Sequence, residues 1–208
     1  MTMTIVDPWD HVTKFETTIA EYAGSKYAIA CDSNSNAIRL VLHYLNIVGE
    51  ILDIPARTYV SVPNQIILSG NKPKFIDKTW EGYYYIGETN IIDSACAFFK
   101  GMYTDLNSYM ILSFHHRKIL NIGTGGMILT NDERFNVWAR PMIYDGRHKY
   151  KMYGEDEFEC IGWHMYMTPE QAKIGMEIFM SDKIQDYNQP CGSSNTYKDL
   201  REQKIYKE

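Results

Sequence analysis

The chain has 208 residues, of which 45% are apolar and 23% charged, an ordinary balance for one globular domain with its own core. The formal net charge of −5 argues against a nucleic-acid partner, and no apolar run approaches the roughly 20 residues that span a bilayer. The first ten residues lack the basic and apolar regions of a signal peptide. Four widely spaced cysteines favour buried thiols in a reduced, cytoplasmic protein: Cys31, Cys96, Cys160 and Cys191.

The first predicted element is a helix over 12–23. Phe15, Ile19 and Tyr22 recur there at helical spacing, and Gly24 follows, a residue that tolerates the positive φ of a helix end. Further helical patterns cover 37–45, 62–70 and 168–179. A capping box is expected at the last of these, with Thr168 as its first member.

Short apolar runs bounded by turn residues predict strands between these helices. They span 27–31, 72–77, 90–93, 109–114 and 125–130. A helix cap is expected at Asn131 or Asp132, at the start of NDERFNVWARPM. Because strands alternate with helices, the fold class is α/β.

The stretch SFHHRKILNIGTGG, residues 113–126, places Lys118 between a strand end and a glycine cluster. A lysine in such a turn is either an ordinary surface residue or a functional residue that the turn holds in position. Two adjacent histidines, His115 and His116, precede it. Adjacent side chains point apart and no third ligand is evident, so we interpret them as lining residues rather than metal ligands.

At this stretch the sequence resembles the DegT/DnrJ/EryC1/StrS family of sugar aminotransferases, pyridoxal-phosphate (PLP) enzymes of the aspartate-aminotransferase fold. In that family a Ser-Phe pair, three variable residues, the coenzyme lysine and glycines follow at this spacing, as in SFHHRKILNIGTGGMILTND. Further blocks follow the family order over roughly 12–179: KFETTIAEYAGSKYAIACDSNSNAIRLVL, IPARTYVSVPNQIILSGNKPKFID, IIDSACA and IGWHMYMTPEQAKIGMEIF.

The resemblance implies a reduced PLP-transferase large domain, a mostly parallel sheet flanked by helices, with the C-terminal small domain largely absent. We expect this domain to span 1–187 and residues 188–208 to form a polar C-terminal tail.

The same resemblance assigns two catalytic residues. Lys118 would hold the coenzyme covalently and then move protons, for which a lowered pKa is useful. Asp93, at the end of the apolar run NII, would lie against the ring nitrogen and keep it protonated. Read without the resemblance, Asp93 would be a strand-end cap and Lys118 a surface lysine.

Binding of the coenzyme phosphate is implied for the turn before the helix at 37–45 and for Ser113. Ser33 and Ser35 offer hydroxyls there. Asn34 stands where the family usually has glycine, and asparagine tolerates a left-handed φ. Tyr59 matches the aromatic residue that stacks on the pyridine ring, although an ordinary core tyrosine is the simpler interpretation.

Several positions depart from the family pattern. Cys96 replaces a glutamine of the coenzyme site, and His164 and Tyr166 replace an asparagine and an arginine that reach the phosphate from the neighbouring subunit. Histidine can still donate to phosphate, whereas tyrosine lacks the guanidinium charge. A helix and a strand are missing between 77 and 90, where the aromatic segment WEGYYYIG fills the gap, joins a dimer interface, or packs on its own core.

The implied function is transfer of an amino group, with glutamate as donor, to a nucleotide-linked keto-sugar in polysaccharide or deoxyamino-sugar synthesis. The implied assembly is a homodimer. One alternative is an impaired homologue that acts as a binding or structural protein, favoured by the missing segments. Another is changed PLP chemistry, such as dehydration or racemisation; Lys118 argues against the dehydratases, because histidine takes the place of the lysine in them.

Overall fold

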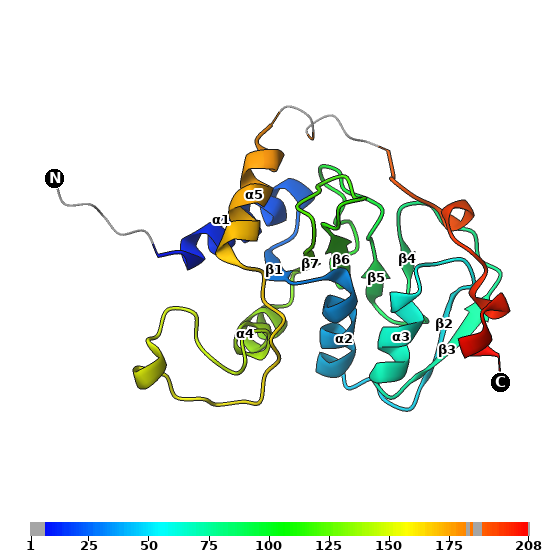
Figure 1. Cartoon of the computed structure of the whole chain (residues 1–208), viewed down its shortest axis with the longest axis horizontal. Helices are drawn as coiled ribbons and strands as arrows, with labels where there is room; N and C mark the ends of the chain where they lie inside the picture. Colours follow the sequence, from blue (N-terminus) through cyan, green and yellow to red (C-terminus); the bar gives the residue numbers. More distant parts are fainter. Residues whose placement is uncertain (1–6, 182–183, 185–188, 208) are drawn as a thin grey trace.

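The computed structural model describes residues 7–181, 184 and 189–207 (Figure 1). Its α-helices are α1 (Trp9–Ala23), α2 (Asn34–Tyr44), α3 (Ser61–Leu68), α4 (Glu133–Met142) and α5 (Pro169–Phe179). Its strands are β1 (Tyr27–Cys31), β2 (Ile51–Pro55), β3 (Lys72–Ile76), β4 (Tyr84–Tyr85), β5 (Ile91–Asp93), β6 (Tyr109–Ser113) and β7 (Gly126–Thr130). Short 3-10 helices are η1 (Tyr153–Glu155), η2 (Ser194–Thr196), η3 (Leu200–Glu202) and η4 (Lys204–Tyr206). Among the helices of these residues, none is long and apolar enough to cross a membrane.

The strands form a five-stranded sheet in the order β1-β7-β6-β5-β4 and a separate parallel pair, β2-β3. Strands β1, β5 and β6 run in one direction, while β7 and β4 run against them. The two strands on either side of Lys118 pair with each other, as the sequence predicts. The predicted α/β class, with a sheet flanked by helices, is confirmed. The five-stranded sheet is mixed: β5 and β6 pair in parallel, and its other neighbouring strands pair antiparallel.

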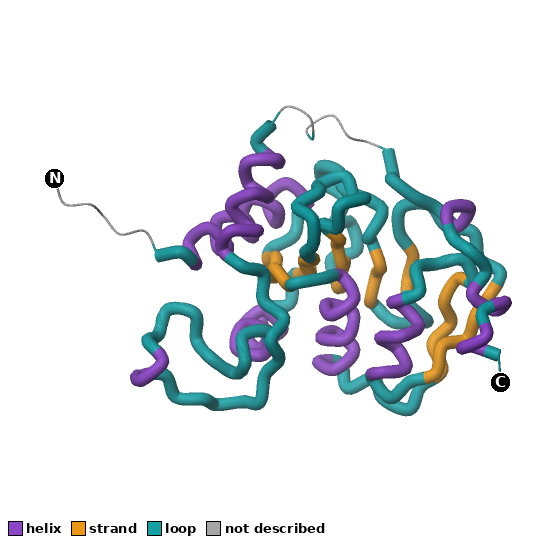
Figure 2. The backbone as a smooth tube through the Cα atoms, viewed as in Figure 1, coloured by secondary structure: helices purple, strands orange, loops and turns teal. Residues whose placement is uncertain are grey.

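Two helical layers cover the sheet (Figure 2). Successive residues of a strand point to opposite faces, and β1 shows this: Ile29 packs in the cluster that contains α2 and α3, while Ala28 and Ala30 pack in the cluster that contains α1 and α5. The sheet is therefore buried on both faces, which explains why its strands read as continuous apolar runs.

Local signals in the sequence fix several helix ends. Gly24 follows α1 with φ 89°, and Thr168 forms the expected capping box with Gln171 at the start of α5. Asp132, rather than Asn131, caps α4. Helix α2 begins at Asn34 instead of 37, because the Ser33 hydroxyl accepts the Asn36 N–H and starts the helix earlier.

The segment that replaces the missing helix and strand lies between β5 and the β2-β3 pair (Figure 1). Tyr84 pairs with Asp93 on one side. On the other side Gly87 donates its N–H to the Asp53 carbonyl at 2.7 Å. Trp80 is buried with Tyr84 and donates its indole N–H to the backbone. The aromatic segment thus fills the gap and packs on the protein's own core.

Residues 189–207 also pack against the body. Ser194 donates its N–H to the Trp80 carbonyl at 3.0 Å, and Leu200 donates its N–H to the Ala56 carbonyl at 2.8 Å. The described part of the predicted tail therefore runs across the β2-β3 pair and the aromatic segment. The domain boundary at 187 lies outside the described residues and stays a prediction.

A buried ion pair joins α1 to α4 and β1. The Glu16 carboxylate accepts from Arg140 at 2.5 and 2.6 Å and from the Ala30 N–H at 2.7 Å, and only 6% of its side chain is exposed. We expect Glu16→Ala to lower the free energy of unfolding by about 3 kcal/mol, because it leaves the Arg140 charge without its carboxylate partner and a strand N–H without its acceptor. Urea unfolding measures this.

The matched control is Glu21→Ala, on the exposed side of the same helix, which should change the free energy of unfolding by less than about 0.5 kcal/mol. Equal effects of the two substitutions would contradict the importance of the pair.

Candidate functional site

One cavity of about 700 Å³ collects most of the predicted site residues. Its walls come from the starts of α2 and α3, the aromatic segment, the end of β5, the turn between β6 and β7, and the C-terminal segment 189–207. Every predicted site residue except His164 lines it: Ser33, Asn34, Ser35, Tyr59, Asp93, Cys96, Ser113 and Lys118.

The first wall is a cluster of hydroxyl groups at two helix starts. Ser33 caps α2, and the Ser35 hydroxyl donates to the Ser61 hydroxyl at 2.7 Å, which joins the starts of α2 and α3. Free N–H groups at a helix start and nearby hydroxyls suit a phosphate. β7 lies directly below, since a Cβ on Gly126 would come within 2.4 Å of the Asn34 nitrogen.

Asn34 behaves differently from the expectation. It is the first residue of α2 and is not among the described residues with positive φ, so the left-handed argument was wrong. Its buried amide instead donates to the Asp93 carboxylate and to the Ile111 carbonyl, each at 3.2 Å. A side chain at this position therefore ties the helix start to the end of β5.

Asp93 forms the floor of the cavity and is 5% exposed. Besides Asn34, its carboxylate accepts from the Tyr84 hydroxyl at 2.7 Å and from the Ala95 N–H at 3.1 Å. Burial and the Asp93 charge raise the pKa of Tyr84 well above its ordinary value, so the phenol remains a donor. Thr58 in turn hydrogen-bonds the Tyr84 hydroxyl at 2.5 Å.

Lys118 is half-buried in the turn after β6. The turn is closed by backbone bonds, including Lys118 N–H to the His115 carbonyl at 2.8 Å, and Gly123 adopts a φ of 91° that favours glycine. The Lys118 amine lies 3.2 Å from the Cys96 sulfur. His115 lines the same cavity, and burial, followed by the charge of His116, lowers its pKa.

Tyr59 lies at the mouth of the cavity, 57% exposed, with its ring centroid 6.4 Å from that of Tyr197. Because it is exposed and lines the cavity, it is not an ordinary core tyrosine, and its ring is accessible to a ligand in the cavity.

His164 and Tyr166 do not line the cavity. His164 is exposed and pairs with the Asp145 carboxylate at 2.8 Å, and its ring contacts that of Tyr166 at 4.7 Å. A role for His164 at the coenzyme phosphate would require a second copy of the chain, and it stays a prediction.

Sequence reasoning missed the residues that reach the cavity from distant segments. These are Thr58, Ser61, Tyr84, Cys191 and Tyr197. Thr58, Ser61 and Tyr84 lie in segments that the sequence analysis singled out, whereas Tyr197 lies in the predicted tail and carried no signal. The thiol prediction also needs correction: all four cysteines are free, but Cys191 is exposed and Cys160 is only partly buried.

The cavity fits pyridoxal phosphate. The deciding observation is Asp93, a buried carboxylate in the cavity wall that has no cation within ion-pair distance among the residues described. Such a group can accept a hydrogen bond from a protonated ring nitrogen. Ser33, Ser35 and the start of α2 would hold the phosphate, and the Lys118 amine is available to the coenzyme aldehyde.

Comparisons with known proteins identify similar sequences and structures that share this fold. GDP-perosamine synthase of Caulobacter vibrioides is 25% identical over 207 residues, covering 79% of this chain and 55% of that protein. DesV of S. venezuelae, solved with a ketimine intermediate, has a TM-score of 0.66 and 17% identity over 81% of this chain and 56% of its own. The ntda protein of Bacillus subtilis, solved with bound cofactor PMP, has a TM-score of 0.64 and 20% identity over 80% of this chain and 47% of its own.

The chain thus spans about half the length of the curated relatives it matches. The model of the DegT/DnrJ/EryC1/StrS aminotransferase family matches residues 4–88 and 90–185, which is most of the sequence. Lys118, Asp93 and the hydroxyl cluster at α2 lie within the matched ranges. The chain therefore belongs to the DegT/DnrJ/EryC1/StrS aminotransferase family.

Proposed function

We propose that this protein transfers an amino group from glutamate to the keto group of a nucleotide-linked sugar, with pyridoxal phosphate as coenzyme. The observation that carries the proposal is the presence of the Lys118 amine and the Asp93 carboxylate in the walls of one cavity, beside the hydroxyl cluster at α2. The product would be an amino sugar for polysaccharide or deoxyamino-sugar synthesis.

When bound, the coenzyme supplies an electron sink for the substrate carbon. The protein does the rest. The Lys118 amine would accept the proton that leaves the carbon of the amino donor and would later return a proton to the carbon of the acceptor. Asp93, held by hydrogen bonds from Tyr84 and Asn34, would lie against the ring nitrogen and keep it protonated. Tyr59, at the cavity mouth, would cover the ring.

The nucleotide-linked sugar is proposed from the charge of the cavity and from the relatives. His116, Arg117 and Lys198 are exposed lining residues, and the cations of Arg117 and Lys198 suit the diphosphate of such a substrate. The Caulobacter relative is named for a product of this class, GDP-perosamine.

The direct test is isotope transfer. The protein is incubated with pyridoxal phosphate, glutamate labelled with ¹⁵N at the amine, and a set of nucleotide-linked keto-sugars, and the sugars are analysed by mass spectrometry. We expect label in one acceptor and none without coenzyme. Coenzyme binding without label in any acceptor would overturn the proposal and favour a binding or structural protein.

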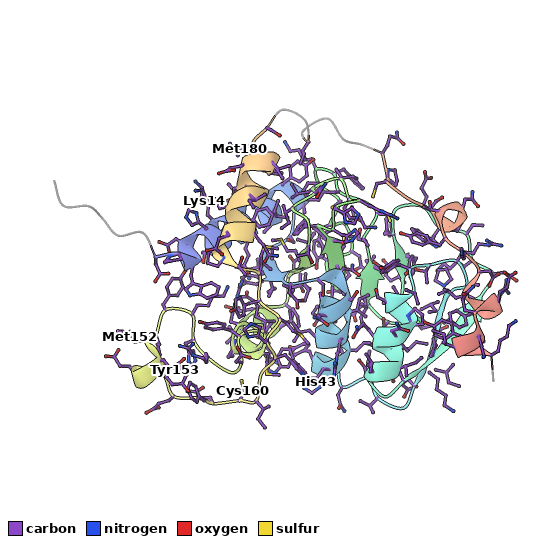
Figure 3. All side chains as sticks on the ribbon, viewed as in Figure 1. Lys14, His43, Met152, Tyr153, Cys160 and Met180 are labelled. Atoms are coloured by element: carbon purple, nitrogen blue, oxygen red, sulfur yellow. The ribbon has the colours of Figure 1, made fainter. Side chains whose placement is uncertain are left out.

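We also propose a homodimer. The excursion 144–162, which contains η1, stands away from the sheet and carries Met152 and Tyr153 at its tip (Figure 3). Large apolar side chains on it are exposed, with Met152 at 74% and Ile161 at 94%. Exposed apolar clusters of this kind indicate an interaction surface. The excursion leads into His164, the residue predicted to reach a second copy.

We expect Ile161→Asp to shift the protein toward the monomer in light scattering, because a buried unpaired charge at an interface is costly. The matched control is Val48→Asp, since Val48 is also exposed but lies outside the excursion. A monomeric wild type, or equal behaviour of the two variants, would contradict this role of the excursion.

A further inference from the structure

The contact between Lys118 and Cys96 is the starting observation. The amine and the sulfur lie 3.2 Å apart, within hydrogen-bond distance, and both residues line the cavity. Cys96 is 2% exposed, so its sulfur is shielded from bulk water and feels neighbouring charges strongly. No step assigned above uses this thiol.

The C-terminal segment packs around Cys96. The Tyr197 hydroxyl lies 3.4 Å from it, and the Cys191 N–H binds the Cys96 carbonyl at 2.8 Å. Gly192 packs directly on it, because a Cβ there would lie 3.0 Å from the sulfur. The indole of Trp80 stacks on Tyr197 with centroids 5.7 Å apart and holds the phenol in place.

These neighbours favour a charged sulfur. Interaction with the Cys191 thiol, followed by the charge of Lys118, lowers the pKa of Cys96, against the opposing effect of burial. The pKa of Cys191 is raised, first by its interaction with Cys96 and then by burial. Burial likewise raises the pKa of Tyr197.

The other charged or titratable side chains that line the cavity are those of Tyr59, Tyr84, Asp93, His115, His116, Arg117 and Lys198. The Asp93 carboxylate, three residues before Cys96, accepts hydrogen bonds from Asn34, Tyr84 and Ala95. The group closest to the sulfur that can carry a full positive charge is Lys118.

We propose that Cys96 is a thiolate paired with the Lys118 ammonium and acts as the positioning residue of Lys118. This role rests on the proposed function. The proton that leaves the Cys96 sulfur is carried by the Lys118 nitrogen, and it returns to the sulfur when Lys118 must be a neutral amine. No oxidant, reductant or other reactant is consumed.

The test is a pH titration of coenzyme-free protein, followed by the ultraviolet absorbance of the thiolate. The spectrum of Cys96→Ser at each pH is subtracted from that of the wild type, so that the difference reports Cys96. We expect a midpoint clearly below the value of about 8.5 for an ordinary thiol. Lys118→Met should raise the midpoint by roughly 1–3 units, because an opposite charge is lost. Lys118→Arg keeps the charge and should leave the midpoint low.

The wild-type midpoint tests the proposal even if a Lys118 variant fails to fold, which far-ultraviolet circular dichroism would reveal. Cys160→Ser is the matched control and should leave the low titration step in place. An ordinary wild-type midpoint, or one that Lys118→Met does not move, would overturn the proposal.

Adding pyridoxal phosphate to the same samples separates the two proposals. A visible absorption band without the low thiol midpoint refutes only the Cys96 role. A low midpoint without a band leaves the ion pair but refutes its role in transamination.

Discussion

Lys118→Ala should lower the rate of ¹⁵N transfer by a factor on the order of 10⁴ or more. The substitution removes both the amine that holds the coenzyme and the base that moves the proton, and general acid–base catalysis alone contributes about 10²–10⁴. Steady-state assays with saturating pyridoxal phosphate measure the effect and separate it from weak coenzyme binding.

Lys100→Ala is the control for this loss. Lys100 is an exposed lysine after β5 that does not line the cavity, so its removal should leave the rate unchanged. Activity of Lys118→Ala within tenfold of wild type would mean that another group carries the chemistry.

Asp93→Asn should have the second largest effect, a loss of rate of roughly 10²–10³. Asparagine keeps the size of the side chain but carries no charge, so it cannot hold a proton on the ring nitrogen. Its amide would also face the donors of Tyr84 and Asn34, which now point at the carboxylate. The measurement is kcat for transfer at saturating coenzyme.

The matched control is Asp105→Asn. The Asp105 carboxylate accepts a hydrogen bond from the Tyr85 hydroxyl at 2.9 Å but lies outside the cavity. It therefore makes the same kind of tyrosine–aspartate bond as Asp93 at a position that the coenzyme would not reach. If both variants lost activity equally, the effect of Asp93 would be structural rather than electrostatic.

The parts of this site that the sequence predicts are local. Lys118 and the glycines after it share one turn, and Asp93 ends one short apolar strand, so spacing alone is informative. The fold class is predictable for the same reason, because each helix and strand shows its own spacing of apolar residues and its own capping or turn residues at its ends.

The remaining parts depend on packing between distant segments. Tyr197 reaches Cys96 across 101 residues, and stacking on Trp80 helps to place it there. The error at Asn34 has a related cause. The sequence suggested a left-handed φ for Asn34, but its side chain is instead placed by a hydrogen bond to Asp93, 59 residues away.

The most direct measurement is the absorbance spectrum of the purified protein titrated with pyridoxal phosphate, for wild type and Lys118→Ala. We expect a visible band in the wild type that borohydride removes, with peptide mapping then locating the coenzyme on Lys118. The variant should show only free coenzyme. A wild type without the band, or a variant that retains it, would contradict the assignment of this cavity as a pyridoxal-phosphate site built around Lys118.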